Sequence, residues 1–274
     1  MFDPVICHLA DDVVMLATPA GRLLRSTMAT LRGRIGLIAD VQYCDLEDGT
    51  DFSGVQVRRY RHSLEVLARA VEDWNSQGQV LLLAQLGDLV DGKAGAGVKD
   101  ADSSEKALEA VTKVLAGCEC KDVVNVVGNH ELYNFSRERL GQLLDVSRGE
   151  KDGRTWFSFL PLEGYKLRIV VLDSYDNSTI ESCKAEGTRR AVAYLREHNP
   201  NDVTSFGVDW SAGLDGLERR FMPYNGMMGE EQLAWLERSL EEAAGAGERV
   251  LVLGHVPLCP GVNRSDENIA TSCI

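Results

Sequence analysis

The segment LIADVQY, Leu37–Tyr43, decides the fold. It contains the end of an apolar run that begins near Arg34, and two polar side chains, Asp40 and Gln42, follow that run. Short apolar runs bounded by polar residues are typical of strands that are buried in a sheet. In α/β sheets, ligands bind beyond the carboxyl ends of the strands. The segment therefore predicts a buried strand that delivers Asp40 and Gln42 to a ligand site.

Further apolar runs recur along the chain, and helical patterns separate several of them. The predicted strands are Arg34–Ala39, Val80–Leu86, Val123–Val127, Leu167–Leu172 and Val250–Leu253. Apolar residues at three- and four-residue spacing predict helices in the two intervals between the first three strands, and a further helix from Glu230 to about Ala244. This alternation predicts an α/β fold with much parallel pairing. Residues 197–226 have no clean period, so we expect a long loop or insertion beside the ligand-binding face.

Composition and charge narrow the class of protein. The 274 residues carry a net charge of −13, which argues against a general binder of nucleic acid or of anionic membranes. No apolar run approaches the roughly 20 residues that span a bilayer. Seven scattered cysteines favour reduced thiols and a cytoplasmic protein. Residues 1–33 are predicted to be an N-terminal extension, with organelle targeting as an alternative, and residues 34–274 to form one large domain.

Polar residues also follow three other predicted strands. Asp88 comes after Gly87, Asn129 after Gly128, and His255 after Gly254. Each motif alone has an ordinary explanation as a turn or a buried histidine. Turn chemistry does not account for metal-competent side chains at four of the five predicted strand ends, so we expect these side chains to form one site.

The motifs DVQ, GD, GNHE and GH, read in this order, resemble the calcineurin-like metallophosphoesterases. The narrower matches DVQY, GNHELYNF (Gly128–Phe135) and YNGMMGEEQLAWL (Tyr224–Leu236) resemble one branch, the manganese-dependent ADP-ribose/CDP-alcohol diphosphatases. The resemblance implies a four-layer αββα sandwich. It also implies hydrolysis of the pyrophosphate bond of ADP-ribose, CDP-choline or CDP-glycerol, giving a nucleoside monophosphate and a phosphorylated sugar or alcohol. Small nucleoside diphosphate-linked substrates are thus the expected partners of a monomeric chain.

The same resemblance assigns roles to the strand-end residues. It places Asp40 and Gln42 on one divalent cation, Asn129 and His255 on a second, and Asp88 between the two. Most relatives carry His where this chain has Gln42, and an amide oxygen is a harder ligand than imidazole. We therefore expect Mn²⁺ to be preferred, with Mg²⁺ possible.

Catalytic and substrate-binding residues are also suggested. His130 is expected to protonate or stabilise the leaving oxygen, as its counterpart does in the wider family. Tyr133 and Asn225 are candidates for substrate contact; Phe135 and Tyr224 are further candidates, although core packing explains the aromatic residues equally well. The arginines Arg58, Arg59 and Arg61 are expected to mark a solvated helix start rather than to clamp phosphate.

The last block of the family pattern, GHxH, is absent, because residues 256–274 contain no histidine. Each cation would then keep three protein ligands, and we expect a sandwich that is incomplete at the C-terminus. A fragment, a naturally short and weakened enzyme, and a non-catalytic nucleotide-binding descendant all fit this pattern. Phosphomonoesterase or cyclic-nucleotide phosphodiesterase activity also stays open.

Overall fold

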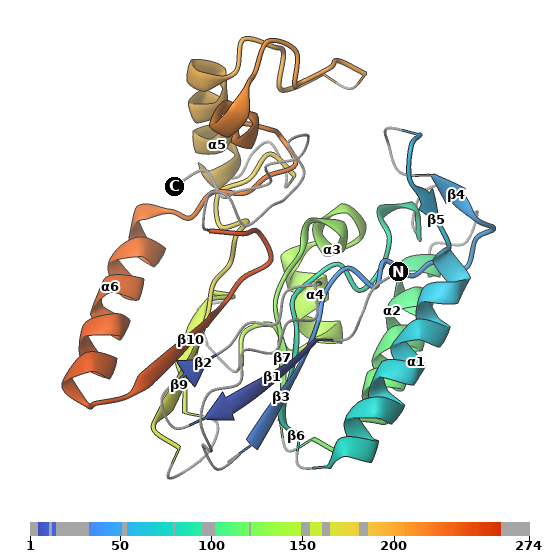
Figure 1. Cartoon of the computed structure of the whole chain (residues 1–274). Helices are drawn as coiled ribbons and strands as arrows, with labels where there is room; N and C mark the ends of the chain where they lie inside the picture. The colour runs from blue at the N-terminus through green and yellow to red at the C-terminus, as the bar shows by residue number, and fades with distance from the viewer. Residues whose placement is uncertain are drawn as a thin grey trace. The chain divides into compact units, whose positions relative to one another are not determined.

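The computed structural model describes most of the chain as two compact units, Met1–Asn125 and Val126–Ile274. The described residues are 5–10 and 13–14 as backbone, and 33–50, 54–78, 80–94, 102–120, 122–148, 154–160, 165–180, 186–205 and 207–258 in full. Each unit has its own sheet and its own helices (Figure 1).

The first unit is built on a five-stranded sheet. Its strands, in spatial order, are β2 (Val13–Val14), β1 (Val5–Ala10), β3 (Gly33–Ile38), β6 (Val80–Gln85) and β7 (Val123–Asn125). Strands β3, β6 and β7 run parallel, as predicted, whereas β1 pairs antiparallel with β3. The register places Gln85 opposite both Ile38 and Asn125, so the three parallel strands end at the same level. The segments that follow them therefore leave the sheet at one edge.

Two helices of the first unit, α1 (Tyr60–Gln77) and α2 (Ser103–Leu115), pack against each other. Trp74 of α1 is fully buried, and a Cβ added at Gly36 of β3 would lie 3.2 Å from its ring. The absence of a side chain at Gly36 therefore lets α1 pack closely on the sheet. A short hairpin of β4 (Gly49–Thr50) and β5 (Val57–Arg58) precedes α1, and the 3₁₀ turn η1 (Gly92–Ala94) follows β6.

The second unit holds a three-stranded sheet in the order β10 (Arg249–Leu253), β9 (Leu167–Val171) and β8 (Phe157–Phe159). Strands β9 and β10 are parallel, and β8 is antiparallel to β9. Its other elements are α3 (Asn129–Asn134), α4 (Arg137–Leu143), α5 (Glu186–His198), η2 (Gly216–Arg220) and α6 (Glu230–Gly245). Helix α6 runs beside β10, and its Leu233 and Leu236 pack on the buried Val170 and Leu172 (Figure 1). The five predicted strands and the helix near Glu230 are thus confirmed.

The segment predicted to be a long loop begins on the last turn of α5 and is mostly irregular. Buried amides, rather than periodic apolar packing, brace it: Asn199 Nδ2 donates to the carbonyl oxygens of Trp210 and Phe221 at 3.0 and 2.8 Å. Because the bracing uses polar side chains at irregular spacing, the sequence shows no helical or strand period there. Within the described ranges, no helix combines the length and the apolar character that a bilayer crossing requires.

Candidate metal centre

In the first unit, hydrogen bonds continue past the ends of strands β3 and β6. The Asp40 N–H donates to the Gly87 carbonyl at 3.0 Å, and the Gln42 N–H donates to the Asp88 carbonyl at 2.8 Å. Asp40, Gln42 and Asp88 all adopt positive φ angles, of 55°, 46° and 59°. Such left-handed conformations are uncommon outside glycine, cost free energy and cluster at functional sites. The hydrogen bonds between the two segments therefore hold the three candidate ligands in a left-handed backbone conformation that is unfavourable without such constraints.

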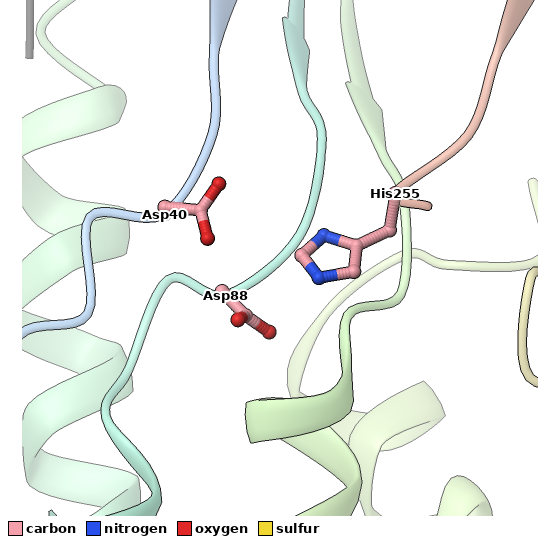
Figure 2. Close-up of side chains that lie close together, drawn as sticks. All are labelled: Asp40, Asp88 and His255. Atoms are coloured by element: carbon pink, nitrogen blue, oxygen red, sulfur yellow. The ribbon is translucent and has the colours of Figure 1, made fainter. Parts of the chain in front are cut away.

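The side chains of these three residues meet. Carboxylate oxygens of Asp40 and Asp88 lie within 4.8 Å of each other, and Figure 2 draws both side chains. The Gln42 Nε2 group donates to Asp40 Oδ1 at 3.4 Å and to Asp88 Oδ2 at 3.1 Å. Two carboxylates this close repel each other unless a donor or a cation lies between them. Their oxygen chemistry fits a hard divalent cation such as Mn²⁺ or Mg²⁺.

The other end of the Gln42 amide faces an arginine. Arg58 Nη1 donates to Gln42 Oε1, and it also forms an ion pair of 2.7 Å with Asp91 Oδ2. The Asp91 side chain is 3% exposed and that of Arg58 is 25% exposed. The expectation of a solvated arginine is therefore wrong for Arg58, because the β4–β5 hairpin places it against a buried carboxylate rather than on the helix.

The neighbouring arginines differ from Arg58. Arg61 lies on the first turn of α1, is half exposed, and pairs with the exposed Asp45 and Glu47. Arg59 is exposed and occupies the N-cap position of α1. For these two residues the prediction of an exposed helix start is confirmed.

The second unit brings together another group of side chains around Asn129. Asn129 is the first residue of α3, and His255 follows β10. The Asn129 Oδ1 atom lies 3.1 Å from His255 Nε2 and accepts a hydrogen bond of 3.2 Å from the Tyr175 hydroxyl. At the other end of the amide, Asn129 Nδ2 donates to the Tyr133 hydroxyl at 3.3 Å. Both ends of the Asn129 amide are therefore engaged by neighbouring side chains of the second unit. Figure 2 also draws His255, the member of this group that follows strand β10.

Sequence reasoning missed Tyr175, although a signal was present. Tyr175 comes shortly after Val171, the end of β9, and so follows the predicted strand Leu167–Leu172, to which no ligand was assigned from the sequence. It is 1% exposed. Its hydroxyl is the buried group that contacts the Asn129 amide.

A buried network holds the backbone of Tyr175. Arg137 forms an ion pair with Asp173 and donates through Nη2 to the Tyr175 carbonyl at 2.7 Å. The Tyr175 N–H in turn donates to Asp173 Oδ1 at 2.8 Å. Gln232 of α6 accepts from the Asp173 N–H at 2.9 Å and donates to the Asp173 carbonyl at 3.0 Å. The position of the Tyr175 hydroxyl thus depends on charges in the core of the second unit.

Comparison with known proteins decides the family. The family model described as calcineurin-like phosphoesterase matches residues 33–269. The chain belongs to the calcineurin-like phosphoesterase family.

Named relatives in this phosphoesterase family are similar over most of the chain. The manganese-dependent ADP-ribose/CDP-alcohol diphosphatase of Arabidopsis thaliana is 42% identical over 83% of this chain and 68% of its own length. The protein of the same name from Oryza sativa subsp. japonica is 39% identical over 82% and 66%, respectively. A crystal structure of a dimetal phosphatase from Danio rerio is 35% identical, has a TM-score of 0.76, and covers 87% of this chain and 73% of that one. The chain thus spans about two thirds of the length of these curated relatives.

The remaining candidate residues of this phosphoesterase lie in the second unit. His130 follows Asn129 on α3, and its ring centroid is 5.3 Å from that of Tyr133, a residue that is 47% exposed. Asn225 is 6% exposed, and its side-chain amide donates to the Arg220 carbonyl at 2.9 Å. The roles of His130, Tyr133 and Asn225 stay predictions.

Proposed function

We propose that this chain hydrolyses the pyrophosphate bond of ADP-ribose and of CDP-alcohols such as CDP-choline and CDP-glycerol. The products are a nucleoside monophosphate and a phosphorylated sugar or alcohol. One observation carries the proposal: Asp40 and Asp88 present carboxylates within 4.8 Å of each other at adjacent strand ends. They do so in a chain whose relatives carry this activity and manganese dependence in their names.

The proposed ligand set is the one that the family resemblance assigns. Asp40 and Gln42 would hold one cation, Asn129 and His255 the other, and Asp88 would bridge them, within a four-layer αββα sandwich. A bound pair of divalent cations polarises the phosphoryl group, supplies a hydroxide nucleophile at neutral pH and stabilises the leaving oxygen. The donors are mainly oxygens, which supports Mn²⁺ first and Mg²⁺ second.

The protein's own contribution is to position ligands and to move a proton. The Tyr175 hydroxyl and the His255 ring both lie within hydrogen-bond distance of Asn129 Oδ1 and so help to hold that side chain. His130, the next residue on α3, is proposed to protonate the leaving oxygen. Replacing His130 by Ala should then lower kcat by about 10²–10⁴-fold while Mn²⁺ content stays unchanged. Loss of Mn²⁺ together with activity would instead make His130 a structural residue of the centre.

A substrate panel tests the proposed reaction. Purified chain with Mn²⁺ is assayed on ADP-ribose, CDP-choline, a 3′,5′-cyclic nucleotide and p-nitrophenyl phosphate, and the products are identified by chromatography. We expect cleavage of the first two to a nucleoside monophosphate, and loss of that activity in Asp88→Asn. Asp45→Asn is the matched control, because Asp45 is an exposed carboxylate of the same unit that pairs with Arg61. Preference for the cyclic nucleotide or the phosphomonoester, or nucleotide binding without turnover, would contradict the proposal.

A further inference from the structure

The side-chain amide of Gln42 is held between groups of opposite charge. Its nitrogen faces the carboxylates of Asp40 and Asp88, at 3.4 and 3.1 Å, and its oxygen faces the guanidinium of Arg58. The reversed amide would place N–H groups against a guanidinium, which has no acceptor, and an oxygen against two carboxylates. Both ends therefore favour the same orientation.

A divalent cation at the carboxylates would reverse this preference. The cation attracts the amide oxygen and repels the NH₂ group that now faces Asp40 and Asp88. Arg58 binds the same oxygen from the opposite end of the amide. In any given orientation of the amide, the Gln42 oxygen can thus contact the Arg58 guanidinium or a cation at the carboxylates, but not both.

The Arg58 guanidinium cannot move with the Gln42 oxygen when the amide rotates. It is held by Asp91, which is 3% exposed and which also accepts a hydrogen bond of 2.9 Å from the Lys93 N–H through Oδ1. Moving Arg58 away would leave a buried carboxylate without its cationic partner, which is strongly unfavourable. The Arg58–Asp91 pair therefore stabilises the orientation in which Gln42 is a donor to the carboxylates.

We propose that Arg58 is a positioning residue that competes with the metal ion for the amide oxygen of Gln42, so that cation binding at Asp40 and Asp88 is coupled to rotation of that amide. This inference rests on the metal centre proposed above. Without a bound cation, the amide NH₂ group would stabilise the two close carboxylates. When a cation binds, it replaces this donor, and the oxygen must leave Arg58 before Gln42 becomes a ligand.

A double-mutant cycle on Mn²⁺ affinity tests the competition. Free Mn²⁺ is measured by electron paramagnetic resonance during titration of wild type, Arg58→Met, Gln42→Met and the double variant. Arg58→Met removes a positive charge near the cations in both backgrounds, so this Coulomb effect cancels in the cycle. We expect Arg58→Met to tighten Mn²⁺ binding about tenfold when Gln42 is present. The gain should be smaller by about fivefold or more when Gln42 is replaced.

Two outcomes separate the inference from the proposed function. Equal fold changes in the two backgrounds would overturn the competition and leave the metal centre intact. A wild-type chain that binds no Mn²⁺ would overturn the metal centre and the inference together. If Arg58→Met fails to fold because Asp91 loses its partner, the same cycle is run in the Asp91→Asn background, where no buried carboxylate is left unpaired.

Discussion

The buried ion pair between Arg137 and Asp173 should be a large contributor to the stability of the second unit. The Asp173 side chain is fully buried, and that of Arg137 is 25% exposed. Arg137 also donates to Thr155 Oγ1 at 3.1 Å and to the Tyr175 carbonyl at 2.7 Å. Replacing Arg137 by Met keeps most of the apolar stem but leaves the Asp173 carboxylate buried without a cation. Breaking such a pair costs about 3–5 kcal/mol, and the partial exposure of Arg137 favours the lower end of this range, about 3 kcal/mol.

Urea unfolding, followed by tryptophan fluorescence, measures this cost. Trp156, Trp210 and Trp235 all lie in the second unit and report on its unfolding. The double variant Arg137→Met/Asp173→Asn should recover part of the loss, because it removes both charges. Arg189→Met is the control, because Arg189 pairs with Glu186 on the exposed face of α5. This variant should unfold at the same urea concentration as wild type. A cost for Arg137→Met below about 1 kcal/mol, the range of exposed pairs, would refute the argument from burial.

Three further predictions concern the segment that holds Tyr175. Tyr175→Phe removes the hydroxyl that orients Asn129 Oδ1, so Mn²⁺ affinity should fall about 10–100-fold in a titration, with little change in stability. Burial raises the pKa of Asp176, so the folded chain binds that proton more tightly than the unfolded chain. The stability contributed by this carboxyl is present below its ordinary pKa and is lost as pH rises through the raised pKa. Asp176→Asn has no such group, so in urea unfolding it should gain stability relative to wild type as pH rises from 4 to 7. Gly226→Ala should unfold the second unit or lower its melting temperature sharply, because the added Cβ would lie 1.7 Å from the Ser174 carbonyl oxygen.

Each of these predictions has a contrasting result. Unchanged Mn²⁺ affinity in Tyr175→Phe would show that the Asn129 amide is oriented without the hydroxyl. A difference between Asp176→Asn and wild type that is constant with pH would remove burial as the cause. Gly141→Ala, on helix α4 with nothing within 4 Å of the added Cβ, is the control for Gly226→Ala and should be tolerated. Equal stability of the two alanine variants would contradict the close approach at Gly226.

The strand ends could be predicted from the sequence because buried parallel strands appear as continuous apolar runs that stop at polar residues. Strand β6 is buried at every position, and Asp88 follows shortly after its end. Helix α3 could not be predicted in the same way, because six residues are too few to show a helical period. Strand β1 lies within residues 1–33, which were predicted to be an extension, and pairs with β3.

Details of the candidate site were harder to predict than its existence. The positive φ angles of Asp40, Gln42 and Asp88 have no sequence signal, because the residues that adopt them are not glycines and the cause is hydrogen bonding between two distant segments. The environment of Arg58 was predicted wrongly for a related reason. Its partners Gln42 and Asp91 are far away in the sequence, and only the folded hairpin brings them to the guanidinium.

The most direct test of the two-cation centre is the number of Mn²⁺ ions that each chain binds, measured together with their magnetic coupling. Equilibrium dialysis gives the stoichiometry, and low-temperature electron paramagnetic resonance distinguishes coupled ions from isolated ones. If Asp88 bridges cations about 3.5–4 Å apart, wild type binds two coupled Mn²⁺ ions per chain and Asp88→Asn loses the coupled signal. Isolated Mn²⁺ in the wild-type chain, or a coupled pair that survives in Asp88→Asn, would contradict the shared-carboxylate centre.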